Sequence, residues 1–131
     1  MQEIGTTDLK TRCSMVTKGI RGAITVDENS AEKIKEATME LFGELLKLNN
    51  LKEESVSHII FTLTYDLNMA FPAKFVREDF GWNNAAMMCF HELDVPNSLR
   101  MCLRILVVVN CDTSFVPKFV YLKGASTLRS K

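Results

Sequence analysis

The chain has 131 residues, 47% of them hydrophobic, and its 16 Lys and Arg residues balance its 16 Asp and Glu residues. This length suits one domain that buries its own core. A formal net charge of zero does not favour a nucleic-acid or membrane partner, and no apolar run approaches the roughly 18 residues that a transmembrane helix needs. We therefore expect a protein with neither kind of partner.

The four cysteines, at positions 13, 89, 102 and 111, form no C-x-x-C pair, and neither histidine stands near a cysteine pair with zinc spacing. The N-terminal residues also lack the apolar segment of a secretory signal. These features predict a reduced, cytoplasmic protein with no bound metal.

Residues 1–17 show no clear periodicity and are interpreted as a leader or an expression-derived segment, followed by one domain over residues 18–131. A strand rich in β-branched residues is predicted at 19–26. After it, Asn29 or Ser30 can cap a helix that runs to about residue 50. The apolar side chains that would line its buried face at helical spacing are Ile34, Ala37, Leu41, Leu45 and Leu48.

The rest of the chain alternates strands with one short helix. Pro72 suits the first turn of a helix over 72–80, and Gly81 suits the position after its end. Strands are predicted at 58–64, 85–91 and 101–110, a short strand or turn at 118–122, and a polar tail at 124–131.

This order of elements predicts an α+β fold, a mixed β-sheet with helices on one face. The strand at 101–110 carries apolar residues on both of its sides, for example Leu103, Ile105 and Val107 against Leu106 and Val108. Since helices would cover only one face, we expect the other face to be covered by further copies of the chain.

Charges inside apolar runs are the residues most suggestive of a site. Arg21 and Arg104 each interrupt an apolar strand, and a buried guanidinium is costly unless it meets an anion. One explanation is a structural ion pair with Glu92 or Asp94. The other is a site for an anionic ligand, because arginine presents a rigid fork that matches carboxylates.

Further cations favour the second explanation. Lys74 and Arg77 share a face of the short helix, and Arg129 follows in the tail. These five cations lie on four otherwise unrelated elements, which suits a dicarboxylate ligand. No glycine-rich phosphate motif is present, and a nucleophilic pair of Cys89 and His91 lacks a third group to orient the histidine.

Several segments resemble one known family. The matching segments are Gly19-Ile-Arg-Gly-Ala-Ile-Thr-Val26, Asp66-Leu-x-x-x-Phe-Pro-Ala-Lys-x-x-Arg77, Gly81-Trp82, Cys89-x-x-Glu-Leu-Asp-Val-Pro-x-Ser-Leu-x-x-Cys-Leu-Arg-Ile-Leu106, Tyr121-Leu122 and Leu128-Arg129. In this order and at this spacing they resemble the AroH-class chorismate mutases, over nearly all of the chain from residue 18 to about 129.

The resemblance implies a homotrimer shaped as a pseudo α/β-barrel, with active sites in clefts between neighbouring subunits. The implied reaction is the unimolecular Claisen rearrangement of chorismate to prephenate in phenylalanine and tyrosine biosynthesis. It needs no cofactor and no metal. The enzyme holds a flexible dianion in a reactive pose and stabilises charge on the breaking ether oxygen.

Roles for individual residues also follow from the resemblance. The catalytic set is Arg104 beside the ether oxygen, Arg21 on a substrate carboxylate, and Glu92 with Cys89 at the ring hydroxyl. Tyr121 would reach a carboxylate. The remaining implied substrate-binding residues are Phe71, Ala73, Lys74 and Arg77 from the adjacent subunit, Met87, Met88, Phe90, His91 and Leu128 in the lining, and Arg129 over the entrance.

A few residues depart from the family pattern. Met88 replaces a small polar residue, His91 replaces a glutamine and is expected to point away from substrate, and Tyr65 replaces a proline. Asn97 stands at a usual glycine and tolerates the positive φ that such a turn needs. Two other functions stay open at this point: a RidA-like trimeric imine deaminase or small-molecule binder, and a regulatory ligand-binding module with an inactive site.

Overall fold

The computed structural model describes residues 15–130, and their side chains as far as residue 128. In chain order the elements are β1 (Met15–Thr25), α2 (Ala31–Asn49), the 3-10 turn η1 (Glu53–Ser55), β2 (Val56–Leu63), α3 (Pro72–Asp79), β3 (Ala86–His91), β4 (Cys102–Asp112), β5 (Val120–Leu122) and the 3-10 segment η2 (Lys123–Ser130).

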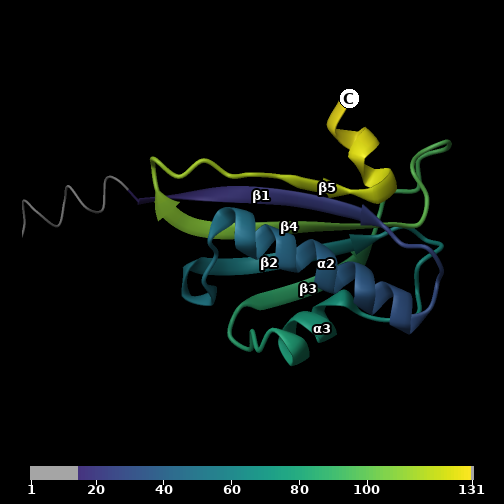
Figure 1. Ribbon diagram of the computed structural model, residues 1–131, viewed down its shortest axis with the longest axis horizontal. Helices are drawn as coiled ribbons and strands as arrows, with labels where there is room; N and C mark the ends of the chain where they lie inside the picture. The colour runs from purple at the N-terminus through teal and green to yellow at the C-terminus, as the bar shows by residue number, and fades with distance from the viewer. Residues whose placement is uncertain (1–14, 131) are drawn as a thin grey trace, which may run out of the picture.

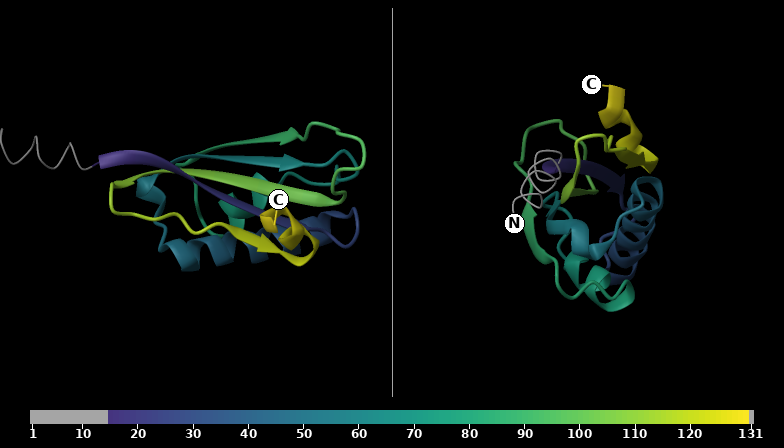
Figure 2. Two further views of the ribbon diagram at one scale, coloured as in Figure 1. Left: turned by 90° about the horizontal axis from the view of Figure 1, so that it is seen from above. Right: turned by 90° about the vertical axis from the view of Figure 1, so that its left-hand side faces the viewer.

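The five strands form one sheet in the order β3-β2-β4-β1-β5. β4 pairs antiparallel with both β1 and β2, whereas β1 with β5 and β2 with β3 are parallel. Both α2 and α3 lie on the same face of the sheet (Figures 1 and 2). The predicted fold class, a mixed sheet with helices on one face, is therefore confirmed.

The ends of several elements differ from the prediction. β1 begins at Met15, because its first residues pair with the far end of β4 in the register Met15 to Asp112. Residues 15–17 of the expected leader thus lie in a strand, and residues 1–14 lie outside the described residues. The expected polar tail forms η2. The domain boundary at residue 18 stays a prediction.

Helix α2 forms for the local reasons that its sequence indicates. The Ser30 side chain accepts a hydrogen bond from the Lys33 N–H, and Asn50 ends the helix in the left-handed region at φ 50°. Ile34, Leu41 and Leu45 are fully or almost fully buried. Leu48 was predicted wrongly, because it is 44% exposed; the apolar stripe instead turns through Phe42.

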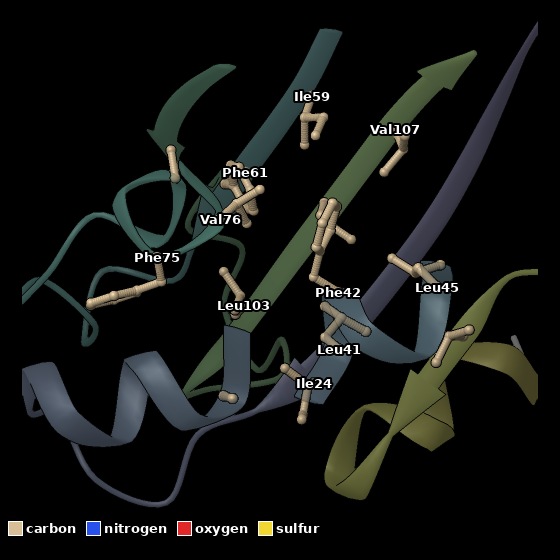
Figure 3. Close-up of a cluster of buried hydrophobic side chains, with 14 of the residues drawn as sticks. Ile24, Leu41, Phe42, Leu45, Ile59, Phe61, Phe75, Val76, Leu103 and Val107 are labelled. Atoms are coloured by element: carbon tan, nitrogen blue, oxygen red, sulfur yellow. The ribbon is translucent and has the colours of Figure 1, made fainter. Parts of the chain in front are cut away.

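The core fills the space between the helices and one face of the sheet. Figure 3 shows Leu41, Phe42 and Leu45 of α2 in one cluster with Ile24 of β1 and Val107 of β4. α2 comes close to β1 because Gly22 has no side chain: a Cβ there would lie 3.0 Å from Leu45 Cδ1. This close contact packs α2 against the part of β1 that carries Arg21.

Neither α2 nor α3 lies on the opposite face of the sheet (Figure 2). The 3-10 segment η2 packs Ala125 and Leu128 against Ala23 and Cys102 there. On β4, Leu103 and Ile105 are buried toward the helices, whereas Arg104 and Leu106 alternate with them and are only half-buried. On β3, Met88 is 59% and Phe90 46% exposed. Because no α-helix covers this side of the sheet, we call it the helix-free face, and we call the other side the helix-covered face.

Candidate functional site

An ion pair on the helix-free face joins β4 to the segment after β3. Arg104 Nε lies 3.1 Å from Glu92 Oε2. Register pairing places Thr62 of β2 opposite Arg104, and the Thr62 hydroxyl donates a hydrogen bond to the same Glu92 oxygen. The structural ion pair considered from the sequence is therefore present, with Glu92 rather than Asp94 as the acid.

A hollow of about 250 Å³ opens beside this ion pair. Four of the predicted site residues line it, namely Arg21, Arg104, Tyr121 and Leu128. Tyr121 stands opposite Ala23 in the β1–β5 register, and residues of β2 also line the hollow, so four neighbouring strands contribute to one concave surface. The exposed Arg21 guanidinium also lies 6.0 Å from the centre of the Phe119 ring. Two guanidinium groups in one hollow suit a ligand with carboxylates.

A second, larger cavity of about 730 Å³ lies on the helix side of the β3 edge. Its lining residues are Ala31, Glu32, Lys35, Leu63, Leu67, Asn68, Met69, Ala70, Phe71, Lys74, Phe75, Cys89, Phe90 and His91. Phe71, Lys74, Cys89, Phe90 and His91 among them are predicted site residues. The predicted site is thus divided between two places in a single chain.

Cys89 belongs to this second group and lies away from Glu92. It stands opposite Phe61, which is buried in the core, and it packs against that core itself. Burial raises the pKa of the Cys89 thiol, and the Ala73 backbone and the Arg77 charge oppose that shift in part. Cys89 is therefore a neutral thiol at neutral pH, next to the start of α3.

The separation of Cys89 from Glu92 follows from the period of the strand. Side chains three positions apart in an extended segment point to opposite faces. Met87 and Cys89 contact the core, whereas Met88 alternates with them and is exposed. Cys89 and Glu92 of one chain accordingly lie on different faces, an arrangement that the alternation of the sequence could have indicated.

His91 forms contacts within its own chain. Its ring stacks on Tyr65, with centroids 4.5 Å apart, and its Nε2 lies 3.4 Å from the Leu67 carbonyl oxygen. Two departures from the family pattern thus contact each other. The side chain of Arg129 lies outside the described residues, and its expected place over the entrance stays a prediction.

A polar network before β4 went unrecognised in the sequence. The Asp66 carboxylate accepts the Met101 N–H at 3.1 and 3.2 Å, and Thr64 donates its hydroxyl to Asp66. Met101 has φ 52° and Asn97 has φ 67°, as expected for Asn97. Short polar residues in the segment 64–66 were the only sequence signal, since the partner lies 35 positions away.

Two kinds of feature are absent from the described residues. Within residues 15–130, no three His, Cys, Asp or Glu side chains gather in a group that could hold a metal ion. No helix in that part of the chain is both long and apolar enough to cross a membrane.

Comparisons with known proteins agree on one family. A family model described as chorismate mutase type I matches residues 17–131. The chorismate mutase AroH of Bacillus subtilis is 37% identical over 119 residues, which are 88% of this chain and 91% of that protein. The chorismate mutase AroH of Thermus thermophilus is 40% identical over 116 residues, 87% of this chain and 94% of that protein.

A solved structure leads to the same family. The chorismate mutase from Clostridium thermocellum superposes with a TM-score of 0.75 at 40% sequence identity, covering 84% of this chain and 98% of that one. The family model, which matches residues 17–131, spans both groups of site residues.

Proposed function

The chain belongs to the type I chorismate mutase family, and we propose that it converts chorismate to prephenate, a step toward phenylalanine and tyrosine, in the cytoplasm. The observation that carries this proposal is the hollow that Arg21 and Arg104 share on the helix-free face. Chorismate is a flexible dianion, and two guanidinium groups from adjacent strands can hold its carboxylate and its ether oxygen in one pose.

Arg104 has the main electrostatic role in this proposal. Negative charge grows on the ether oxygen as its bond to carbon breaks, so a fixed cation stabilises the transition state more than the ground state. The Nε of Arg104 is buried against Glu92, which leaves the outer end of the guanidinium for the substrate. Arg21 and Tyr121 bind a carboxylate, and Leu128 closes the apolar side of the hollow.

The active site is completed by a neighbouring chain. In one chain the proposed site residues line two separate cavities. Those that line the hollow on the helix-free face are Arg21, Arg104, Tyr121 and Leu128, and those that line the larger cavity at the edge beside β3 are Phe71, Lys74, Cys89, Phe90 and His91. The helix-free face exposes Met88 and Phe90, an apolar surface that suits burial against further copies in a homotrimer. One chain then supplies Arg21, Arg104 and Glu92, and its neighbour supplies Phe71, Ala73, Lys74 and Arg77.

This assignment moves Cys89 to the neighbour's half of the site. Its thiol lies beside Ala73 and Arg77, so it approaches the substrate together with α3 rather than with its own chain's Glu92. A neutral thiol can donate to a ring hydroxyl or to a carboxylate without adding charge.

The activity is tested by incubating the protein with chorismate. Loss of the ultraviolet absorbance of chorismate with stoichiometric formation of prephenate supports the proposal, and a sizing run reports the trimer. Binding of chorismate without loss of absorbance would indicate an inactive binding module instead.

Mixed trimers test the division of the site. An Arg104→Ala chain and a Lys74→Ala/Arg77→Ala chain each lack one half, so each is inactive alone. After the two are unfolded and refolded together in equal amounts, about a quarter of the sites regain both intact halves if neighbouring chains build each site. If one chain built a whole site, mixing would restore no activity.

A further inference from the structure

Thr62 is the residue at this site to which neither the resemblance nor the cation pattern gives a role. It lies on β2 between Arg104 of β4 and Phe90 of β3 in the sheet register, and its side chain lines the hollow with Arg21 and Arg104. Its hydroxyl donates to Glu92 Oε2. Thr62 therefore contacts the acid that pairs with Arg104.

Glu92 Oε2 accepts a hydrogen bond from the Thr62 hydroxyl and forms an ion pair with Arg104, whose Nε lies 3.1 Å away without making a hydrogen bond. Arg104 Nε is fully buried, although the side chain as a whole is 35% exposed. The exposure of this side chain therefore comes from atoms other than Nε. Both contacts are made to the same carboxylate oxygen, so the Thr62 hydroxyl and the Arg104 Nε meet at one point of Glu92.

We propose that Thr62 is a positioning residue for the rearrangement: its hydroxyl orients the Glu92 carboxylate, which in turn keeps Arg104 engaged through Nε so that its outer nitrogens face the substrate. Without the hydroxyl, the Glu92 carboxylate rotates and competes with the substrate for those nitrogens. This inference rests on the proposed chorismate mutase activity.

The effect of losing the hydroxyl falls mainly on kcat. Charge on the ether oxygen is greatest in the transition state, so a displaced guanidinium costs more there than in the bound substrate. Thr62→Val keeps the shape and β-branching of the side chain and removes only the hydroxyl. We expect kcat to fall about tenfold, or about 1.4 kcal/mol of barrier, while KM changes less than about threefold.

Two matched variants separate positioning from packing. Thr62→Ser restores the hydroxyl with less bulk and is expected to keep kcat within about twofold of the original chain. Thr113→Val removes an exposed hydroxyl that contacts only Asp112 among the described residues, and it is expected to leave kcat unchanged. Thr62→Ala serves in place of the valine variant if the latter does not fold.

A double-mutant cycle tests whether Thr62 acts through Glu92. In a Glu92→Ala background Thr62→Val is expected to lower kcat by less than about twofold, because the group that it orients is gone. An unchanged tenfold loss in that background would overturn the proposal, as would a Thr62→Val chain with the original kcat or a Thr62→Ser chain as slow as the valine variant.

A readout without substrate distinguishes this inference from the proposed activity. In nitrogen-edited NMR spectra the Arg104 Nε–H is expected to be protected from solvent exchange in the original chain and in Thr62→Ser, and to exchange faster in Thr62→Val. Equal exchange in all three would overturn the positioning role even if chorismate is converted. An original chain that leaves chorismate intact would refute the proposed function, and with it the catalytic part of this role.

Discussion

The two faces of the sheet differ in the kind of side chain that they carry. The helix-covered face is packed with buried apolar side chains from α2, α3 and four strands, so its contribution is stability. The helix-free face holds Arg21, Arg104 and Thr62 around a hollow, with Glu92 paired to Arg104, and leaves apolar residues exposed beside them. One strand can contribute both to the core and to the site, because its side chains alternate between the two faces.

The largest effect is expected on the helix-covered face. Phe42 is fully buried and makes edge contacts with Phe80 and Trp82, with ring centroids 5.0 and 4.9 Å apart. Phe42→Ala should lower the free energy of unfolding by about 3–5 kcal/mol, measured by urea denaturation. The activity of each folded molecule should stay near normal, and a large loss of kcat at low temperature would contradict the separation of the faces.

On the helix-free face the expected effect is on rate. Arg104→Ala should lower kcat at least about a hundred-fold, because a preorganised charged donor at the reacting oxygen is lost. The oligomeric state and the melting temperature should change little. Lys47→Ala removes the same charge from the exposed last turn of α2 and serves as the control. A near-normal kcat for Arg104→Ala would remove the electrostatic role from this residue.

Asp66 is expected to affect both the stability of the chain and its kcat. Its carboxylate holds the Met101 N–H just before β4, where the backbone is in the left-handed region at φ 52°. Asp66→Ala should destabilise the chain by about 1–3 kcal/mol and also lower kcat, since β4 carries Arg104. Asp66→Asn keeps one oxygen acceptor and should lose less of both. Thermal melting and chorismate assays on the two variants measure the difference.

The smallest expected effect concerns pH. Burial raises the pKa of the Cys89 thiol in the folded chain, so the unfolded chain releases this proton first as pH rises. The contribution of the protonated thiol to the free energy of unfolding is therefore complete below the ordinary pKa of a thiol, and it declines as the pH rises above that value. Cys89→Ala should flatten this decline in urea denaturation at alkaline pH. In the original chain Cys89 should react with iodoacetamide several-fold more slowly than after unfolding; equal rates would contradict its burial.

Local patterns predicted much of the fold. The capping by Ser30, the end of α2 at Asn50 and the start of α3 at Pro72 follow from side-chain and backbone chemistry within one or two turns. Leu48 was misplaced because a helix of 19 residues drifts around its axis relative to the sheet. Helical spacing alone does not show where that sheet ends.

The sequence by itself determined the elements, the mixed sheet with helices on one face and the family, because periodicity, caps and spaced motifs are properties of neighbouring residues. Only the tertiary structure decided that Cys89 and Glu92 lie on opposite faces, and that Thr62 and Arg104 share one carboxylate oxygen. The latter depends on strand register, in which a shift by one residue turns every side chain to the other face.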